Sequence, residues 1–387
     1  MSSDSTIDYN ALAQDIKAWG KALGFQQIGI SDTDLQKHKP HLQRWLEASY
    51  HGDMSYLQDN IEKRLAPDKL LPGTTRIISV RMNYLPPDAK FAHSLKQKAH
   101  AYISRYAVGR DYHKVLRGRL KRLGQQIHQA APHAQFRPFV DSAPVLEHAI
   151  AEKSGIGWTG KHSLTISEQD GSWFFLGELF VNLPLPVDQP VAEKCGSCVA
   201  CIKICPTGAI VAPYVVDGRK CISYLTIENK GTIPEQYRHA MGNRIYGCDD
   251  CQLICPWNRF ATMSAEADFQ ARHQLTDIEL LELFHWDEDT FLSKTEGTAI
   301  RRIGFERWQR NIAVALGNAP FCEAIVTALE KKLKYSSEMV KEHIHWALQQ
   351  QKVKQAAQVG KSTTEKTANR LTLRLIRSIE KGLPRDA

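Results

Sequence analysis

Hydrophobic and polar residues follow different periods in different parts of the chain. Near the N-terminus, residues 8–23 carry apolar side chains at helical spacing and are followed by Gly24, which predicts an amphipathic helix. Residues 25–31, 76–85 and 136–141 are short runs with β-branched and aromatic side chains, which predicts strands. The first part of the chain is therefore expected to combine helices with a sheet.

A second group of apolar runs lies between residues 144 and 194. Residues 144–155 have helical periodicity, and residues 162–169 and 173–181 flank Asp170-Gly171-Ser172, which predicts a hairpin. The segment 181–194 (VNLPLPVDQPVAEK) contains three prolines and predicts a linker. Neither a P-loop nor a GxGxxG motif occurs in this part, so the sequence does not support a nucleotide site there.

The last part of the chain has helical periodicity. Residues 299–318, 322–334 and 337–351 form three amphipathic stretches separated by short breaks, which predicts antiparallel helices similar to HEAT-type repeats. A final helix has apolar and basic positions side by side, namely Leu371, Leu375, Ile379 and Leu383 next to Arg370, Arg374, Arg377 and Lys381. We expect its apolar stripe to pack on the protein core rather than on a membrane, because no second membrane signal accompanies it.

These patterns predict an α+β protein with four parts. They are an α/β domain over residues 1–190, a cysteine-rich module over 191–265, HEAT-like helices over 266–351 and a basic tail over 352–387.

The composition excludes a membrane-spanning protein. The 387 residues are 43% hydrophobic and 24% charged, and no apolar run approaches the roughly 20 residues that a membrane span needs. Because MSSDSTIDYN lacks the basic and apolar regions of a signal peptide, we expect the protein in the cytosol. In that reducing compartment the nine cysteines are better explained as metal ligands than as disulfides.

Positive charge is concentrated at the C-terminus. The chain carries a net charge of +8, and residues 352–387 hold nine Lys and Arg against three Asp and Glu. A basic block of this kind suits a polyanion, most commonly nucleic acid. A solvated basic tail is the alternative that the charge distribution leaves open.

The cysteines form two related motifs that differ by fifty residues in position. Cys198-x-x-Cys201-x-x-x-Cys205-Pro206 has the spacing of Cys248-x-x-Cys251-x-x-x-Cys255-Pro256, and Cys195 extends the first motif. In two-cluster ferredoxins with this spacing, the fourth cysteine of a run binds the other cluster. The rule assigns one 4Fe–4S cluster to Cys195, Cys198, Cys201 and Cys255. It assigns the second to Cys205, Cys248 and Cys251, with Cys221 as the nearby candidate for the fourth ligand.

Zinc is the competing interpretation of these motifs, since structural zinc sites also use Cys-x-x-Cys pairs. Two crossed repeats that each end in Cys-Pro favour iron–sulfur clusters. Cys322 remains outside both motifs, and its place in a helical pattern predicts a small buried side chain.

Candidate acid–base chemistry lies in the first domain. Asp141 follows an apolar strand, where desolvation would favour its protonated form and allow it to donate a proton; an N-terminal helix cap is the simpler interpretation. The glycine-rich segment 155–163 could approach a flat cofactor or could simply turn the chain. Asp111-Tyr112-His113 begins like the cobalt-binding Asp-x-His-x-x-Gly motif but has Leu116 in place of glycine, so we expect His113 to be an ordinary polar residue.

Three blocks carry a resemblance to a known family. FVDSAPVLEHAIAEKSGIGWTGKHSL, CGSCVACIKICPTGAI, and the pair CISYLTIE and YGCDDCQLICPWN occur in this order. Over residues 10–350 the chain resembles the epoxyqueuosine reductases. The resemblance implies a cobalamin-dependent enzyme with two 4Fe–4S clusters, which reduces epoxyqueuosine at the wobble position of tRNA to queuosine. It also implies a nitroreductase-like cobalamin-binding domain, a two-cluster ferredoxin-like module and HEAT-like helices that hold the tRNA.

The resemblance implies a division of labour in the reaction. Conversion of an epoxide to an alkene takes two electrons and two protons, and an external low-potential donor would supply the electrons through the clusters to cobalt. Asp141 is implied as the acid that protonates the departing oxygen, and the Cys221 loop would bring the second cluster close to the corrin. The implied corrin contacts are Arg64, Tyr106, Asp141, Trp158, Lys161 and Ser223.

Other kinds of protein share parts of this pattern. Reductive dehalogenases resemble the chain in cobalamin and cluster use but usually carry an export signal. A ferredoxin-type electron carrier would leave the first domain and the basic helices unexplained, and a zinc-stabilised RNA-binding protein would be colourless. We expect a monomer, because the sequence shows no spare apolar helix stripe for pairing.

Overall fold

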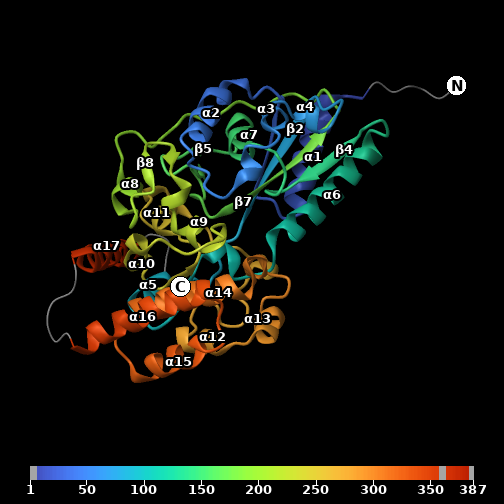
Figure 1. Cartoon of the computed structure of the whole chain (residues 1–387). Coiled ribbons are helices and arrows are strands. Elements are labelled where there is room, and N and C mark those ends of the chain that lie inside the picture. Colours follow the sequence, from blue (N-terminus) through green and yellow to red (C-terminus); the bar gives the residue numbers. More distant parts are fainter. Residues whose placement is uncertain (1–6, 357–362, 383–387) are drawn as a thin grey trace. The chain divides into compact units, whose positions relative to one another are not determined.

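The computed structural model of the chain describes residues 7–356 and 363–382 (Figure 1). The chain forms two compact units. The first comprises the chain up to Ser49 with Ser55–Tyr84 and Tyr112–Cys198; the second comprises Tyr50–Met54, Leu85–Asp111 and the chain from Val199 onwards. The predicted division into four parts is finer than these two units and stays a prediction, whereas the mixed α+β class is confirmed.

A four-stranded antiparallel sheet forms the centre of the first unit, in the order β1-β2-β7-β4. Its strands are β1 (Gln27–Ser31), β2 (Arg76–Asn83), β4 (Phe136–Phe139) and β7 (Phe174–Val181). Every residue of β7 is buried, as expected for an inner strand covered on both faces.

Helices cover both faces of this sheet (Figure 1). The helices of the first unit are α1 (Tyr9–Ala22), α2 (Lys39–Glu47), α3 (Ile61–Leu65), α4 (Pro67–Leu70), α6 (Tyr112–Ala130) and α7 (Glu147–Lys153). On one face, Gly177 of β7 leaves room for Leu116 and Leu120 of α6. On the other face, Ile150 of α7 packs with Phe180 of β7. The sheet is thus the middle layer of three.

The hairpin predicted around Asp170-Gly171-Ser172 is wrong in its pairing. The turn forms, with Ser167 and Gly171 exchanging backbone hydrogen bonds. However, the two-residue strand β6 (Thr165–Ile166) pairs with β5 (Trp158–Thr159), while β7 pairs with β2 and β4. An inner position buries both faces of the apolar β7, which a local turn signal cannot reveal.

The second unit is mainly helical. Its helices are α5 (Phe91–Lys96), α8 (Ala200–Ile204), α9 (Ile222–Ile227), α10 (Glu235–Met241), α11 (Asp250–Leu253), α12 (Leu280–His285), α13 (Glu288–Lys294), α14 (Gly304–Asn318), α15 (Glu323–Leu333), α16 (Glu338–Ala356) and α17 (Thr363–Glu380). Its short strands are β3 (Tyr102–Ile103), β8 (Ile210–Ala212), β9 (Val215–Val216) and β10 (Arg244–Tyr246). Strand β3 pairs in parallel with β10, which joins the 85–111 segment to the cysteine-rich region.

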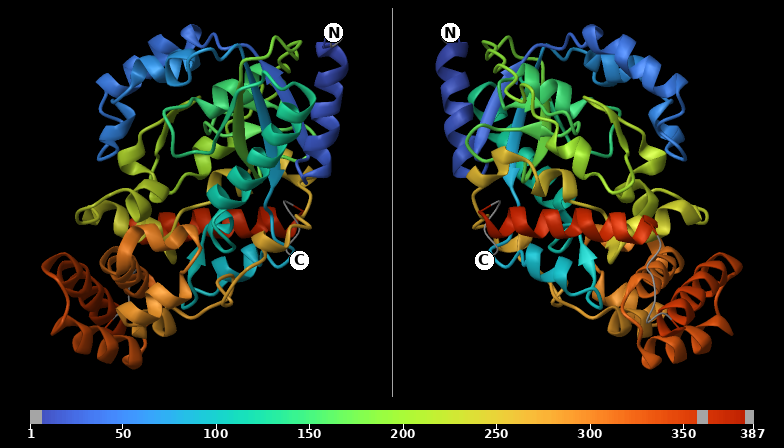
Figure 2. Two further views of the ribbon diagram at one scale, coloured as in Figure 1. Left: turned by 90° about the vertical axis from the view of Figure 1, so that its right-hand side faces the viewer. Right: turned by 90° about the vertical axis from the view of Figure 1, so that its left-hand side faces the viewer.

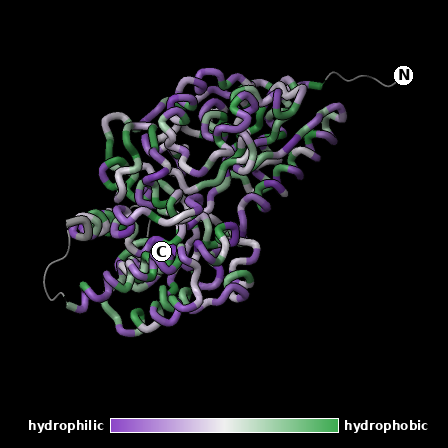
Figure 3. Tube along the Cα trace, in the orientation of Figure 1, coloured by the Kyte–Doolittle hydropathy of each residue, from purple (hydrophilic) through white to green (hydrophobic). Residues whose placement is uncertain are grey.

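The three helices predicted near the C-terminus are confirmed as α14, α15 and α16. Gly317 lets the indole of Trp346 approach α14, and α15 also packs against α16. Hydrophilic and hydrophobic residues alternate along these helices, as Figure 3 shows. Their arrangement as HEAT-type repeats stays a prediction.

The final helix, α17, is the long red helix of Figure 2, and its predicted apolar stripe is buried at Leu375 and Ile379 and half-buried at Leu371. The helix packs against α5, α10 and α11 of the same unit. Leu383, the last predicted member of the stripe, lies outside the described residues. Among the helices of residues 7–356 and 363–382, none combines the length and the apolar character needed to cross a membrane.

Candidate functional site

Four cysteines of the second unit lie close together: Cys205, Cys221, Cys248 and Cys251. The charges of Cys221, Cys205 and also Cys201, a predicted ligand of the other cluster, act on the Cys251 thiol, and Cys251 in turn acts on Cys248. Helix α8 leads into Cys205 and packs against α11, which contains Cys251. The four predicted ligands of the second cluster are thus brought together.

The loop Cys248–Cys251 is fixed by the two aspartates inside it. Asp249 is buried and accepts a hydrogen bond of 2.9 Å from the hydroxyl of Tyr102. Asp250 forms a two-pronged ion pair with Arg244, with both N–O distances at 2.8 Å. The side chains of this pair are only 2% and 3% exposed, so the charges satisfy each other within the core. These contacts set the positions of both thiols.

Backbone N–H groups point at the remaining two thiols. Cys221 immediately precedes α9, and its sulfur accepts hydrogen bonds from the backbone of Ser223 and Tyr224. The backbone N–H of Ala209 donates to Sγ of Cys205 over 3.2 Å. Such donors stabilise sulfur in its anionic, metal-binding form.

Burial opposes that anionic form. It raises the pKa of the thiols of Cys221, Cys248 and Cys251, and neighbouring cysteine charges raise those of Cys221 and Cys251 further. Four thiolates at one place therefore need a bound cationic group, and an all-sulfur donor set suits iron–sulfur clusters or zinc. The residues fit a 4Fe–4S cluster, and the cysteine spacing favours it over zinc.

The predicted ligands of the other cluster are divided between the two units. Cys195 and Cys198 belong to the first unit, and the buried Cys201 and Cys255 to the second. Within the first unit, Nζ of Lys161 donates to the carbonyls of Gly196 and Cys198, the latter over 3.0 Å. The common binding of these four cysteines to one cluster stays a prediction.

The glycine-rich segment 155–163 and Cys322 differ from what their sequence patterns predict. The glycine-rich segment contains the short strand β5, in which Trp158 lies, and is therefore not only a turn. The predicted burial of Cys322 is wrong, because this residue is exposed. It precedes α15 in an extended conformation, so helical periodicity does not apply to it.

Asp141 lies in a strained turn and does not cap a helix. Its φ of 53° is left-handed, and the backbone N–H of Ser142 donates to the carbonyl of Val140 over 2.6 Å. This pattern is a γ-turn, a rare conformation for a non-glycine residue, and the left-handed backbone costs about 1–2 kcal/mol. Helix α7 begins only at Glu147, with no side-chain cap, so the capping interpretation is wrong.

The carboxylate of Asp141 is held by two residues that the sequence did not single out as its partners. The Tyr112 hydroxyl donates to Oδ2 over 2.5 Å, and Nε2 of His113 lies 3.2 Å from the same oxygen. The Tyr112 ring stacks between those of His113 and Phe175, each with centroids 4.1 Å away. The expected desolvation of Asp141 is also wrong, since its side chain is 51% exposed in the chain alone.

The other predicted cofactor contacts occupy both units. In the first unit, Arg64 is 7% exposed and donates from Nη2 to the carbonyl of Tyr56, whereas its buried Nε has no acceptor among the described residues. In the second unit, Ser223 hydrogen bonds the Cys221 thiol, and Tyr106 hydrogen bonds Tyr246. The buried Nε of Arg64 therefore keeps hydrogen-bonding capacity for an incoming ligand.

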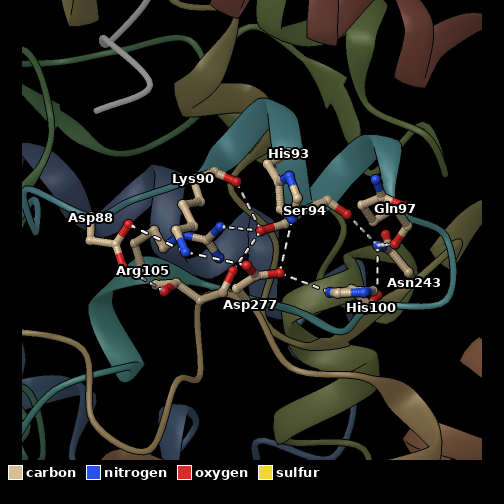
Figure 4. A network of polar contacts seen from close by, with 10 residues as sticks. Asp88, Lys90, His93, Ser94, Gln97, His100, Arg105, Asn243 and Asp277 are labelled. Carbon is tan, nitrogen blue, oxygen red and sulfur yellow. Dashed lines mark hydrogen bonds and ion pairs between the residues drawn. The ribbon is translucent and has the colours of Figure 1, made fainter.

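A separate polar cluster in the second unit is shown in Figure 4. His93 Nε2 and His100 Nδ1 lie 2.9 and 2.8 Å from Oδ1 of Asp277, a set of atoms that could bind a metal ion. Lys90 also pairs with Asp277, at 3.2 Å, and its charge opposes cation binding. Burial by itself raises the pKa of Asp277, but hydrogen bonds to Lys90, His100 and His93 outweigh burial and lower the pKa. We interpret the cluster as an ion-pair network.

Known families match two segments of the chain. A family described as "Epoxyqueuosine reductase QueG, DUF1730" matches residues 64–142. A family described as "4Fe-4S double cluster binding domain" matches residues 194–258, the cysteine-rich region.

Proteins similar over the whole length carry the same description. The chain is 60% identical over 381 residues to the epoxyqueuosine reductase of Escherichia coli, covering 98% of this chain and 99% of that protein. It is 56% identical over 345 residues to the enzyme of Pseudomonas aeruginosa, covering 89% and 96%.

Solved structures agree with these relatives. An epoxyqueuosine reductase crystallised with an epoxyqueuosine-modified tRNA-Tyr stem loop matches with a TM-score of 0.82 and 26% identity, covering 96% of this chain and 100% of that one. The enzyme of Bacillus subtilis, with its catalytic loop swung out of the active site, matches with a TM-score of 0.79 and 25% identity, covering 95% and 100%.

Replacement of Cys221 tests the ligand set of the second cluster. Cys221→Ser should lower the iron content of anaerobically reconstituted protein by about half, because the three remaining thiolates hold a 4Fe–4S cluster poorly. Iron and sulfide analysis with visible absorption measures the change. Cys322→Ser is the matched control, because this exposed cysteine lies outside both motifs. An unchanged iron content in Cys221→Ser would remove Cys221 from the ligand set.

Proposed function

The chain belongs to the epoxyqueuosine reductase family, and we propose that it reduces epoxyqueuosine in tRNA to queuosine with two 4Fe–4S clusters and cobalamin. The observation that carries this proposal is the 60% identity to the Escherichia coli enzyme over nearly the full length of both chains. The meeting of Cys205, Cys221, Cys248 and Cys251 supports the electron-transfer part. An external low-potential reductant would supply the electrons.

The first unit offers residues that could hold cobalamin. The corrin periphery carries amides, whose oxygens suit the buried Nε of Arg64, which lacks an acceptor among the described residues. Lys161 hydrogen bonds the carbonyls of Gly196 and Cys198 in the same unit and would fix the loop there, while Trp158 stays a predicted contact. When bound, cobalamin supplies a strongly reducing and nucleophilic cobalt centre. Tyr106 and Ser223, in the second unit, stay predicted contacts.

Asp141 is the residue of this chain that we propose protonates the departing epoxide oxygen. The exposed carboxyl group can reach a bound substrate, and Tyr112 and His113 fix its direction. A positioned acid assists C–O cleavage because the oxygen leaves as a neutral hydroxyl and finally as water. His113, when protonated, can return a proton to Asp141 after each turnover, since its Nε2 lies 3.2 Å away.

Asp141→Asn tests this role. The amide keeps the size of the side chain but cannot donate a proton to the oxygen, so turnover should fall by about 10²–10⁴-fold. Cluster content, cobalamin binding and tRNA binding should be retained. The measurement is the ratio of queuosine to epoxyqueuosine in nucleosides digested from tRNA after anaerobic reaction. Turnover close to that of the parent would remove Asp141 from the mechanism.

We further propose that the basic face of α17 binds tRNA phosphates. Its apolar side is buried in the second unit, while Arg370, Arg374 and Arg377 are exposed on the other side. Three arginines about one helical turn apart can follow a phosphate backbone, and each neutralised phosphate releases counterions.

Removing these three charges should weaken tRNA binding and make it less sensitive to salt. The variant Arg370→Ala/Arg374→Ala/Arg377→Ala should reduce the slope of log affinity against log salt by about 2, if all three contact phosphates. Titration of labelled tRNA at several salt concentrations measures the slope.

The matched control removes three exposed charges from the first unit. Lys21→Ala/Lys121→Ala/Arg122→Ala lowers the net charge equally, on α1 and α6. Equal losses of slope in both variants would show a general charge effect and contradict a specific role for α17.

A further inference from the structure

Two carboxyl groups, Glu147 and Glu178, lie behind the Asp141 turn. Glu147 is the first residue of α7, and Glu178 lies within β7, opposite Ser79 of β2 in the strand register. The side chain of Glu178 shares a sheet face with Phe180, on which α7 packs, and Glu178 is 0% exposed. Glu147 and Glu178 hydrogen bond each other.

This contact requires a proton. Two ionised carboxylates can only accept hydrogen bonds, and among the described residues no N–H or O–H group donates to either oxygen of Glu178. A fully buried carboxylate without donors or a cation is strongly disfavoured. Glu178 is therefore the neutral acid, and it donates its O–H to the carboxylate of Glu147.

Glu147 in turn holds the backbone of Asp141. Its Oε1 accepts the N–H of Asp141 over 2.5 Å, at the residue whose φ is left-handed. The O–H of Glu178 and the N–H of Asp141 thus converge on one carboxylate. This interaction acts on the backbone of the turn, whereas Tyr112 and His113 act on the Asp141 side chain.

We propose that the proton shared by Glu147 and Glu178 positions Asp141 by holding its strained turn in the conformation that presents the carboxyl group to substrate. Without the proton, two adjacent carboxylates would repel each other, and Glu147 would move away from Glu178 and from the turn. The inference rests on the proposed role of Asp141 as the proton donor. Glu147 and Glu178 are positioning residues in this scheme, since neither replaces Asp141 as the acid.

The surrounding charges agree with a retained proton. Burial, followed by the charge of Asp141, raises the pKa of Glu147 to about 7. Burial and the charge of Glu147 raise the pKa of Glu178 well above the ordinary carboxyl range. His113 of α6 acts in the opposite direction on Glu147, and burial lowers the pKa of His148, the next residue of α7. The raised pKa of Glu178 means that its proton is kept at neutral pH and is lost only as the pH rises through that raised pKa.

Two variants of Glu147 separate positioning from simple loss of packing. Glu147→Ala removes the acceptor of the Asp141 N–H and should lower kcat on the order of 10²-fold, with KM for tRNA little changed, because misplacement by about 1 Å has that effect. Glu147→Gln keeps an amide oxygen for the N–H and should restore most of the activity. Glu47→Gln, an exposed glutamate at the end of α2, is the matched control and should behave as the parent.

Two measurements on the full-length protein do not depend on turnover. Amide hydrogen exchange of the Asp141 segment should be faster in Glu147→Ala than in the parent and in Glu147→Gln. Infrared difference spectra should show the carbonyl band of a protonated carboxylic acid above neutral pH in the parent. That band should be absent in Glu178→Gln and present in Glu47→Gln.

The outcomes distinguish this inference from the proposed function. If the infrared band persists in Glu178→Gln, or if exchange at Asp141 is the same in Glu147→Ala and the parent, the shared proton does not position the turn. If those results are as expected but Asp141→Asn retains turnover, the pair holds a loop whose carboxyl group is not the proton donor. Absence of queuosine formation by the parent would instead contradict the proposed function itself.

Discussion

The constraint on which most of the structure depends is the gathering of four cysteine sulfur atoms, which must be thiolates to bind a metal cluster. Cys205, Cys221, Cys248 and Cys251 come from separate segments, and burial opposes the thiolate form that a metal cluster requires. The chain meets this constraint with N–H donors at two sulfurs and with the buried Arg244–Asp250 pair beside the third and fourth. These contacts hold the thiols in place, and the charge of a bound cluster would compensate the repulsion among them.

A second group of acidic side chains, Asp141, Glu147 and Glu178, lies in the first unit. Glu147 and Glu178 are too close together and too poorly supplied with donors for both to ionise, so a proton takes the place of a cation. Asp141 sits on the exposed side of this pair in a strained turn. Strain at a reactive carboxyl group is commonly maintained by the surrounding structure, here by Glu147 at the backbone and Tyr112 at the side chain.

The sequence predicted what depends on local spacing. Helical periodicity was enough to find α14–α16, and the cysteine spacing was enough to locate the cysteine-rich region, whereas the division of its thiols between two clusters stays a prediction. The sequence did not predict which strands pair. Strand β7 takes an inner position because it pairs with β2 and β4, and the turn that precedes it does not reveal this pairing. For the same reason the partners of Asp141 were missed: they come from the start of α6 and from α7, which only the fold brings together. The sequence did not identify His113 as a partner of Asp141, because the motif around His113 resembles a cobalt-binding motif and gives no sign of that contact.

The most direct test of the account is whether the purified chain forms queuosine and what it needs to do so. The full-length protein, reconstituted anaerobically with iron, sulfide and cobalamin, would be given a low-potential reductant and tRNA that carries epoxyqueuosine. Nucleosides digested from the tRNA would then be separated and identified by mass spectrometry, with each cofactor omitted in turn. The account predicts queuosine only in the complete reaction, with loss of product when either cobalamin or the iron–sulfur clusters are left out. Equal formation of queuosine without cobalamin, or no queuosine in the complete reaction, would contradict it.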